Sequence, residues 1–169
     1  MLAEIMIGSA LGSMVLAGVL SAFTLLLRSG TSAANYSTME AQTRRAFEQL
    51  GIDARMASDI TWNSTTSVTL TVPNNYAANG NKVTYAYDSA NRWFSLVPGD
   101  GSTSTGRLIL VREVASVTFY RYTRDSSDAA TDAVTKRLKM SISVRRNVGG
   151  SAVTENITSA SFTLRNKDV

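Results

Sequence analysis

The pattern of apolar and polar positions divides the chain into three stretches. Residues 5–27 form the first stretch, the apolar segment, which carries no charged side chain. In the second stretch, apolar or small residues recur at spacings of three and four, as expected for an amphipathic helix. From Ile60 onward the period becomes two, which indicates strands that bury one face. The second stretch carries its repeat on Tyr36, Met39, Thr43, Ala46, Phe47, Leu50, Ala54 and Ala57.

The apolar segment is long enough to span a bilayer as a helix, which takes about 20 residues. A secretory signal peptide would carry a basic region and a shorter apolar core of about 7–15 residues. Here no Lys or Arg precedes the apolar residues, and the first charged residue is Glu4. We therefore expect residues 1–28 to be a retained membrane or filament-core helix.

Small residues crowd the interior of this segment. Gly8 and Gly12 make a GxxxG step, and Ser9, Ser13 and Ala17 form a second stripe at a spacing of four, continued by Ser21. Such residues let helix backbones approach closely inside a membrane, where water cannot drive association. The pattern favours a helix that packs against copies of itself. The alternative is a single membrane anchor with incidental glycines, of which Gly18 is the third.

The amphipathic pattern predicts a helix over residues 31–58, the first part of a globular domain covering 29–169. Most charged side chains of this stretch fall on other faces than its apolar repeat, and Asp53 is counted among these outward residues. Joined to the apolar segment, this gives one helix from near residue 1 to about residue 58. At 1.5 Å per residue it would be roughly 87 Å long.

The period-two region, residues 60–169, predicts about six or seven strands. A hairpin is expected from 82–87 and 92–97 around the turn 88–91, and an exposed loop over 125–135. The other expected strands are 68–72, 108–111, 114–122, 138–145 and 159–165. One long N-terminal helix followed by strands predicts an α+β fold, with the helix packed on a largely antiparallel β-sheet.

Composition narrows the chemistry. The chain has neither Cys nor His, which excludes disulfides, Cys/His zinc sites and any Cys or His nucleophile–base pair. The 17 Lys and Arg residues against 13 Asp and Glu are spread along the chain, so we expect no dedicated nucleic-acid binding. No residues assemble a nucleophile, a base and an oxyanion stabiliser. We expect no catalytic residue, no cofactor and no metal, and thus no enzyme.

Glu4 raises a separate question, because an unpaired carboxylate is costly in hydrocarbon. The nearest cation is a free α-amino group, on its own chain or on a neighbouring copy. Leu2-Ala3-Glu4-Ile5-Met6-Ile7, followed by a helix rich in small residues, resembles the mature N-terminus of type IV pilins and type II secretion pseudopilins. The sheet region, with NKVTYAYD and the ending Leu164-Arg165-Asn166, resembles the larger minor pilins of that family.

The resemblance implies how the chain matures and assembles. A prepilin peptidase cuts the precursor, the new N-terminus, here Met1, is usually methylated, and the subunit waits in the inner membrane. Pilus assembly machinery then builds a helical homopolymer at the cell surface, in which Glu4 neutralises the N-terminal amine of an adjacent subunit. The candidate assembly residues are Met1, Glu4, Gly8, Ser9, Gly12, Ser13, Ala17 and Gly18.

Some alternatives stay open. The family usually places its Glu at the fifth mature position and this chain at the fourth, so either one residue precedes Met1 or the subunit is a variant. The chain could be a pseudopilin or a minor tip pilin, or a monomeric membrane-anchored surface-binding domain. Some secretion pseudopilins bind calcium in a loop like that of Asp125, Asp128 and Asp132. Its spacing lacks the ligand pattern of an EF-hand, and we expect a solvated acidic loop.

Overall fold

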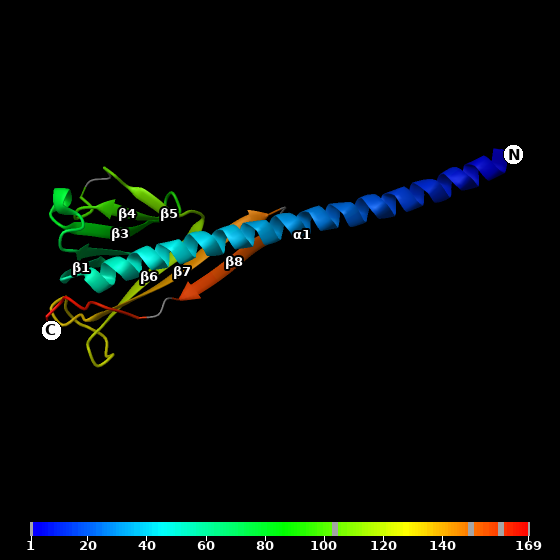
Figure 1. Cartoon of the computed structure of the whole chain (residues 1–169). Coiled ribbons are helices and arrows are strands. Elements are labelled where there is room, and N and C mark those ends of the chain that lie inside the picture. The colour runs from blue at the N-terminus through cyan, green and yellow to red at the C-terminus, as the bar shows by residue number, and fades with distance from the viewer. Residues whose placement is uncertain (1, 103–104, 149–150, 159–160, 169) are drawn as a thin grey trace.

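The computed structural model describes residues 2–102, 105–148, 151–158 and 161–168. Its first element is a single α-helix, α1 (Leu2–Met56), of 55 residues. At 1.5 Å per residue it is about 82 Å long. Figure 1 shows its N-terminal part projecting far beyond the sheets, while its C-terminal part lies across them. The expected long helix that joins the apolar and amphipathic stretches is confirmed.

The two halves of α1 differ in burial. Every described residue from 2 to 31 is exposed, and we call this the exposed half. The packed half, residues 39–56, turns one stripe into the core. The buried residues of α1 are Met39, Thr43, Ala46, Leu50, Gly51, Asp53 and Ala54.

The first sheet is a five-stranded meander in the order β1-β2-β3-β4-β5. Each strand pairs antiparallel with the next, as short connections between sequential strands allow. The expected hairpin is confirmed, because Asp88 accepts hydrogen bonds from the backbone N–H groups of Ala90 and Asn91 and closes the turn between β3 and β4. The strands are β1 (Asp59–Ser64), β2 (Ser67–Thr71), β3 (Lys82–Asp88), β4 (Trp93–Pro98) and β5 (Leu108–Val111), with a short 3₁₀ turn at Ala77–Asn79.

The second sheet is built around β7 (Arg137–Val148), which pairs antiparallel with three strands. These are β6 (Val114–Tyr122), β8 (Ser151–Thr158) and β9 (Phe162–Thr163). The packed half of α1 contacts β5, β7 and β9, so the helix bridges the two sheets. Leu50, Phe94, Phe119 and Met140 come from the helix and both sheets and are fully buried in one shared core. The expected α+β fold is confirmed.

Three expectations need correction. The described residues hold nine strands rather than six or seven, since β1 and β8 were not expected. The last expected strand, 159–165, is the two-residue β9, and Ser159 and Ala160 lie outside the described residues. Asp53, expected on an outward face, is completely buried, because polar groups from the first sheet and its loop surround it.

Candidate functional site

The exposed half of α1 presents an extended apolar surface. Its large side chains between Leu2 and Leu27 are 55–79% exposed. By length and composition α1 could cross a membrane, since an 18-residue window reaches a mean hydropathy of 2.1 with none of it buried. Exposed apolar surface on this scale marks a membrane or protein interaction site.

The hydroxyl groups of the segment are already satisfied within the helix. Ser9 and Ser13 donate to the carbonyl oxygens of Met6 and Ala10 at 2.9 and 2.8 Å. Ser21 and Thr24 donate in the same way to Ala17 and Ser21. Side chains bonded to the preceding turn expose no unsatisfied hydroxyl. The segment is therefore compatible with hydrocarbon, where unsatisfied polar groups cost several kcal/mol.

The glycines of the exposed half have no packing role in a single copy. A Cβ atom added at Gly8, Gly12 or Gly18 would meet nothing within 4 Å. At Gly51, in the packed half, the added atom would lie 2.9 Å from the Phe162 ring. Glycine inside a helix costs about 1 kcal/mol relative to alanine. That cost has an internal packing reason at Gly51 and none in the exposed half.

The continuous helix brings most of the predicted assembly residues together. Residues four apart share a face, so Glu4, Gly8 and Gly12 form one exposed stripe. Ser9, Ser13 and Ala17 form the adjacent stripe, also exposed. Gly18 lies on the face opposite Ser9, nine residues or half a turn away at 100° per residue, and points within about 40° of Glu4, about 21 Å further along the axis. Met1 lies outside the described residues.

Asp53 is the centre of a buried cluster that sequence reasoning missed. Its Oδ2 atom accepts hydrogen bonds from the hydroxyls of Tyr85 at 2.6 Å and Tyr76 at 2.8 Å. Gln49 donates to the same oxygen at 3.4 Å, and Asn75 donates to Oδ1 at 3.3 Å. The cluster ties α1 to β3 and to the loop after β2, so its role is to hold the helix on the sheet.

The two phenols respond to this carboxylate. Burial, and then the charge of Asp53 and the hydrogen bond to it, raise the pKa of Tyr85 far above its ordinary value. Burial and the hydrogen bond to Asp53 raise the pKa of Tyr76 in the same direction. Both phenols therefore stay protonated and remain donors at neutral pH.

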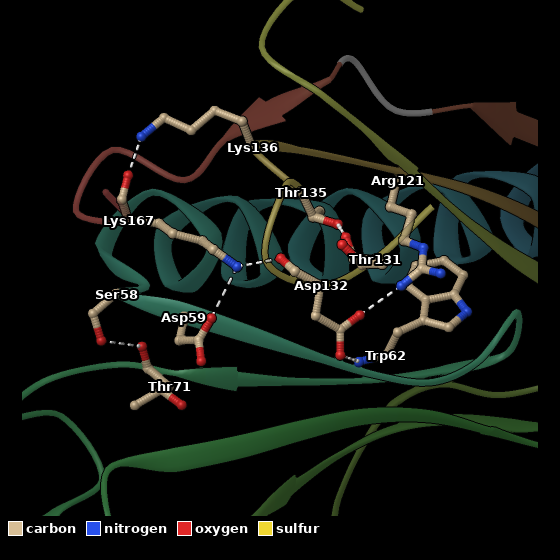
Figure 2. A network of polar contacts seen from close by, with 10 residues as sticks. All are labelled: Ser58, Asp59, Trp62, Thr71, Arg121, Thr131, Asp132, Thr135, Lys136 and Lys167. Atoms are coloured by element: carbon tan, nitrogen blue, oxygen red, sulfur yellow. Dashed lines mark hydrogen bonds and ion pairs between the residues drawn. The ribbon is translucent and has the colours of Figure 1, made fainter. Parts of the chain in front are cut away.

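A second polar network fixes the C-terminal segment (Figure 2). The buried ammonium of Lys167 donates to the backbone carbonyl of Asp132 and forms an ion pair with Asp59 at 2.9 Å. Lys136 donates to the backbone carbonyl of Lys167. Asn166 donates to the carbonyl of Met56 at 3.0 Å, in the last turn of α1. Polar contacts thus hold the C-terminal segment of this cysteine-free chain against the helix end.

The acidic loop is only partly the solvated loop that was expected. Asp125 and Asp128 are exposed, but Asp132 is half-buried. Its Oδ1 atom lies 2.5 Å from Nη1 of Arg121, and its Oδ2 atom accepts a hydrogen bond from the backbone N–H of Trp62 at 3.0 Å. Figure 2 shows Arg121 beside the Trp62 ring, 4.9 Å from its centre. Within the described residues, no group of three or more Asp or Glu side chains could hold a metal ion.

Comparisons with known proteins add no assignment: no protein-family model matches the chain, and no curated protein matches it. The only support for the resemblance to pilins comes from the architecture of the described residues. One long, apolar N-terminal helix packed on antiparallel sheets is a pilin-like arrangement.

Proposed function

We propose that this chain is the structural subunit of a type IV pilus-like filament that polymerises through the exposed half of α1. The observation that carries the proposal is the single helix that is exposed over residues 2–31, carries no charge over residues 5–27, and then packs into a folded domain. The role is structural rather than enzymatic. The membrane holds the helix before assembly, and the finished filament lies outside the cell.

The exposed half suits two successive environments. In a bilayer its length, its apolar side chains and its internally bonded hydroxyls match the hydrocarbon. In a filament the same side chains must be covered by other copies, because exposed apolar area costs about 25 cal/mol per Å². Gly8 and Gly12 provide the close approach that such packing needs.

Glu4 supplies the specific contact. A carboxylate moved into the core of a filament needs a cationic partner, since an unpaired buried charge costs several kcal/mol. The N-terminal amine of an adjacent copy is a partner that every copy brings. The contact therefore repeats along the polymer.

The proposal is tested with Glu4→Ala and Glu4→Gln in the full chain, expressed with its assembly system. We expect sheared filaments to be lost or strongly reduced in both variants, with membrane-bound subunit unchanged. Asp125→Ala, which removes an exposed carboxylate in the loop after β6, is the matched control and should assemble normally. Normal filament yield from both Glu4 variants would contradict the assigned role.

A monomeric membrane-anchored binding domain is the second candidate, since a helix that can cross a membrane fits it equally well. The two functions differ in what the glycines do. Gly8→Leu with Gly12→Leu should abolish assembly in a filament subunit and leave a simple anchor unaffected. Imaging of surface filaments and membrane fractionation separate the two.

A further inference from the structure

A groove of about 570 Å³ runs beside the packed half of α1. The helix lines it with Glu40, Arg44, Phe47 and Ile52, and the second sheet lines it with Ile157 of β8 and Phe162 of β9. The groove spans residues 40–55 of the helix, about 22 Å at 1.5 Å per residue.

The groove has an apolar floor. Gly51 lets the Phe162 ring lie directly against the helix, and Arg55 stacks its guanidinium over that ring at 5.9 Å. Ile52 is 50% exposed, although it belongs to the packed half. Phe47 and Ile157 are half-buried and contact the core from outside. The volume of the groove lies in the range of ligand clefts. Its apolar floor suits a helix that lies along the groove and inserts a row of apolar side chains.

The groove and the Glu4 stripe lie on the same face of α1. Glu40 follows Glu4 by 36 residues, which is ten turns at 3.6 residues per turn. Arg44 follows Gly8 and Glu48 follows Gly12 by the same interval. A helix packed along this face is therefore continuous with the surface through which the chain is proposed to polymerise.

We propose that the groove receives the apolar segment, residues 5–27, of a second copy of this chain. The inference rests on the proposed function and names the surface of the domain that the polymer contact uses. The apolar floor of the groove suits a helical, apolar occupant, and a segment of the same chain is available wherever the groove itself is. The exposed half of another copy meets these conditions, since its large side chains have no cover in a single chain.

The charges around the groove favour a neutral occupant. Two acidic and two basic side chains line it, Glu40 and Glu48 with Arg44 and Arg55, and Arg44 pairs with Glu48 at 3.7 Å. The net charge of the lining is therefore zero. A strongly charged peptide would find no opposite field there, whereas the apolar segment carries no charge to oppose.

Disulfide trapping tests the contact directly, because the natural chain has no Cys. Ile52→Cys is combined in turn with Leu16→Cys, Leu20→Cys, Phe23→Cys or Leu27→Cys, and intact filaments are oxidised. A disulfide requires Cα atoms about 4.4–6.8 Å apart, whereas positions 16 and 52 of one helix are about 54 Å apart. Every such crosslink therefore joins two copies. We expect crosslinks between position 52 and at least one partner position, and none between position 120 and any of them when Tyr120→Cys, on an exposed part of β6, replaces Ile52→Cys.

Charge substitution provides the second measurement. Ile52→Glu should lower filament yield at least tenfold with membrane-bound subunit unchanged, and Tyr120→Glu should not. If the wild-type chain forms filaments but filaments of the Ile52→Cys variants show no crosslink, the groove contact is overturned and the filament proposal stands. Crosslinks only to another protein would overturn it as well. Failure of the wild-type chain to form filaments would instead overturn the proposed function, and the groove contact with it.

Discussion

The two halves of α1 have the same backbone conformation but different reasons to be helical. The packed half buries one stripe against two sheets, and its Leu50, Ala46 and Ala54 are fully enclosed. The exposed half buries nothing within a single copy. Helix propensity alone stabilises an isolated helix only slightly, so the packed half owes its stability mainly to tertiary packing. The exposed half is suited to hydrocarbon, where every backbone group must be paired internally and a helix achieves this.

Burial inside one copy separates the residues of α1 that stabilise the fold from those that the chain's own domain leaves exposed. Gly51 and Gly8 make the point, since both are glycines in the same element. Gly51 accommodates a ring of its own chain, and Gly8 leaves an open surface. Substitutions at the buried residues of the packed half should therefore change stability, whereas substitutions at exposed positions of the helix should change association.

Removal of the exposed half should have the largest effect. A fragment that begins at Ser29 should lose all membrane association and remain monomeric, because the exposed apolar surface goes with residues 1–28. Its sheets and packed half should stay folded, since the core residues begin at Met39. Sedimentation with membranes, light scattering and circular dichroism measure this. Filaments formed by the fragment alone would show that the domain drives assembly.

Matched leucines in the two halves sharpen the contrast. Leu50→Ala should lower the free energy of unfolding by about 2–5 kcal/mol, because it leaves a cavity at a fully buried site. Leu16→Ala, at a site 62% exposed, should change it by no more than about 0.5 kcal/mol. Both are measured on the full chain in detergent, by urea unfolding followed through tryptophan fluorescence. Equal losses would mean that the exposed half contributes to the fold of the domain.

Asp53→Asn tests the polar anchor of the packed half. The amide replaces a carboxylate that accepts two phenol hydrogen bonds, so we expect a loss of about 3 kcal/mol. Urea unfolding of the Ser29 fragment measures it, with Asp125→Asn in the exposed loop as control. A loss below about 0.5 kcal/mol would show that the cluster does not hold the helix.

Asp53→Asn should also change how the free energy of unfolding depends on pH in the alkaline range. The pKa values of Tyr76 and Tyr85 are raised in the folded state, first by burial and then by Asp53. The protonated phenols therefore contribute folding stability that is fully present below the unfolded tyrosine pKa of about 10. This stability is lost as pH rises above that value toward the raised folded pKa values. Without the charge at position 53, the folded pKa values fall and the loss above pH 10 becomes shallower. Unfolding curves across the alkaline range and ultraviolet titration of the phenols measure both effects.

Lys167→Met should have the smallest effect, about 1–2 kcal/mol, because water can rehydrate the largely exposed Asp59 carboxylate. Lys139→Met, on the outer face of β7, is the control. Partial burial opposes ionisation of Asp59, but the hydrogen bond from Lys167, the Ile60 N–H and the Lys167 charge together lower its pKa. The ionised Asp59 therefore contributes folding stability that is fully present above the unfolded Asp pKa of about 3.9. This stability is lost as pH falls through the lowered folded pKa. Acid unfolding of the variant should lack this part of the pH dependence.

Local patterns account for the elements that could be predicted. The apolar segment and the repeat from Met39 to Ala57 define the two halves of α1, because helix amphipathicity is read from spacing alone. Alternation and turn residues predicted β3, β4 and β6 close to their observed bounds. The strand β8, SAVTENIT, gave no such signal, because it is polar and its strand state depends on pairing with β7.

Composition and helical spacing are enough to identify the apolar segment, its small-residue stripes and Glu4. Tertiary structure decided which polar residues became part of the core. By its spacing on the helix, Asp53 looks like a solvent-facing carboxylate. In the fold it is buried because Tyr76 and Tyr85, more than 20 residues later in the chain, lie over it and donate hydrogen bonds to it. Lys167 becomes a buried ammonium only because the C-terminus returns to Asp59 and Asp132. Long-range contacts choose the partners of buried polar groups, and no local spacing encodes them.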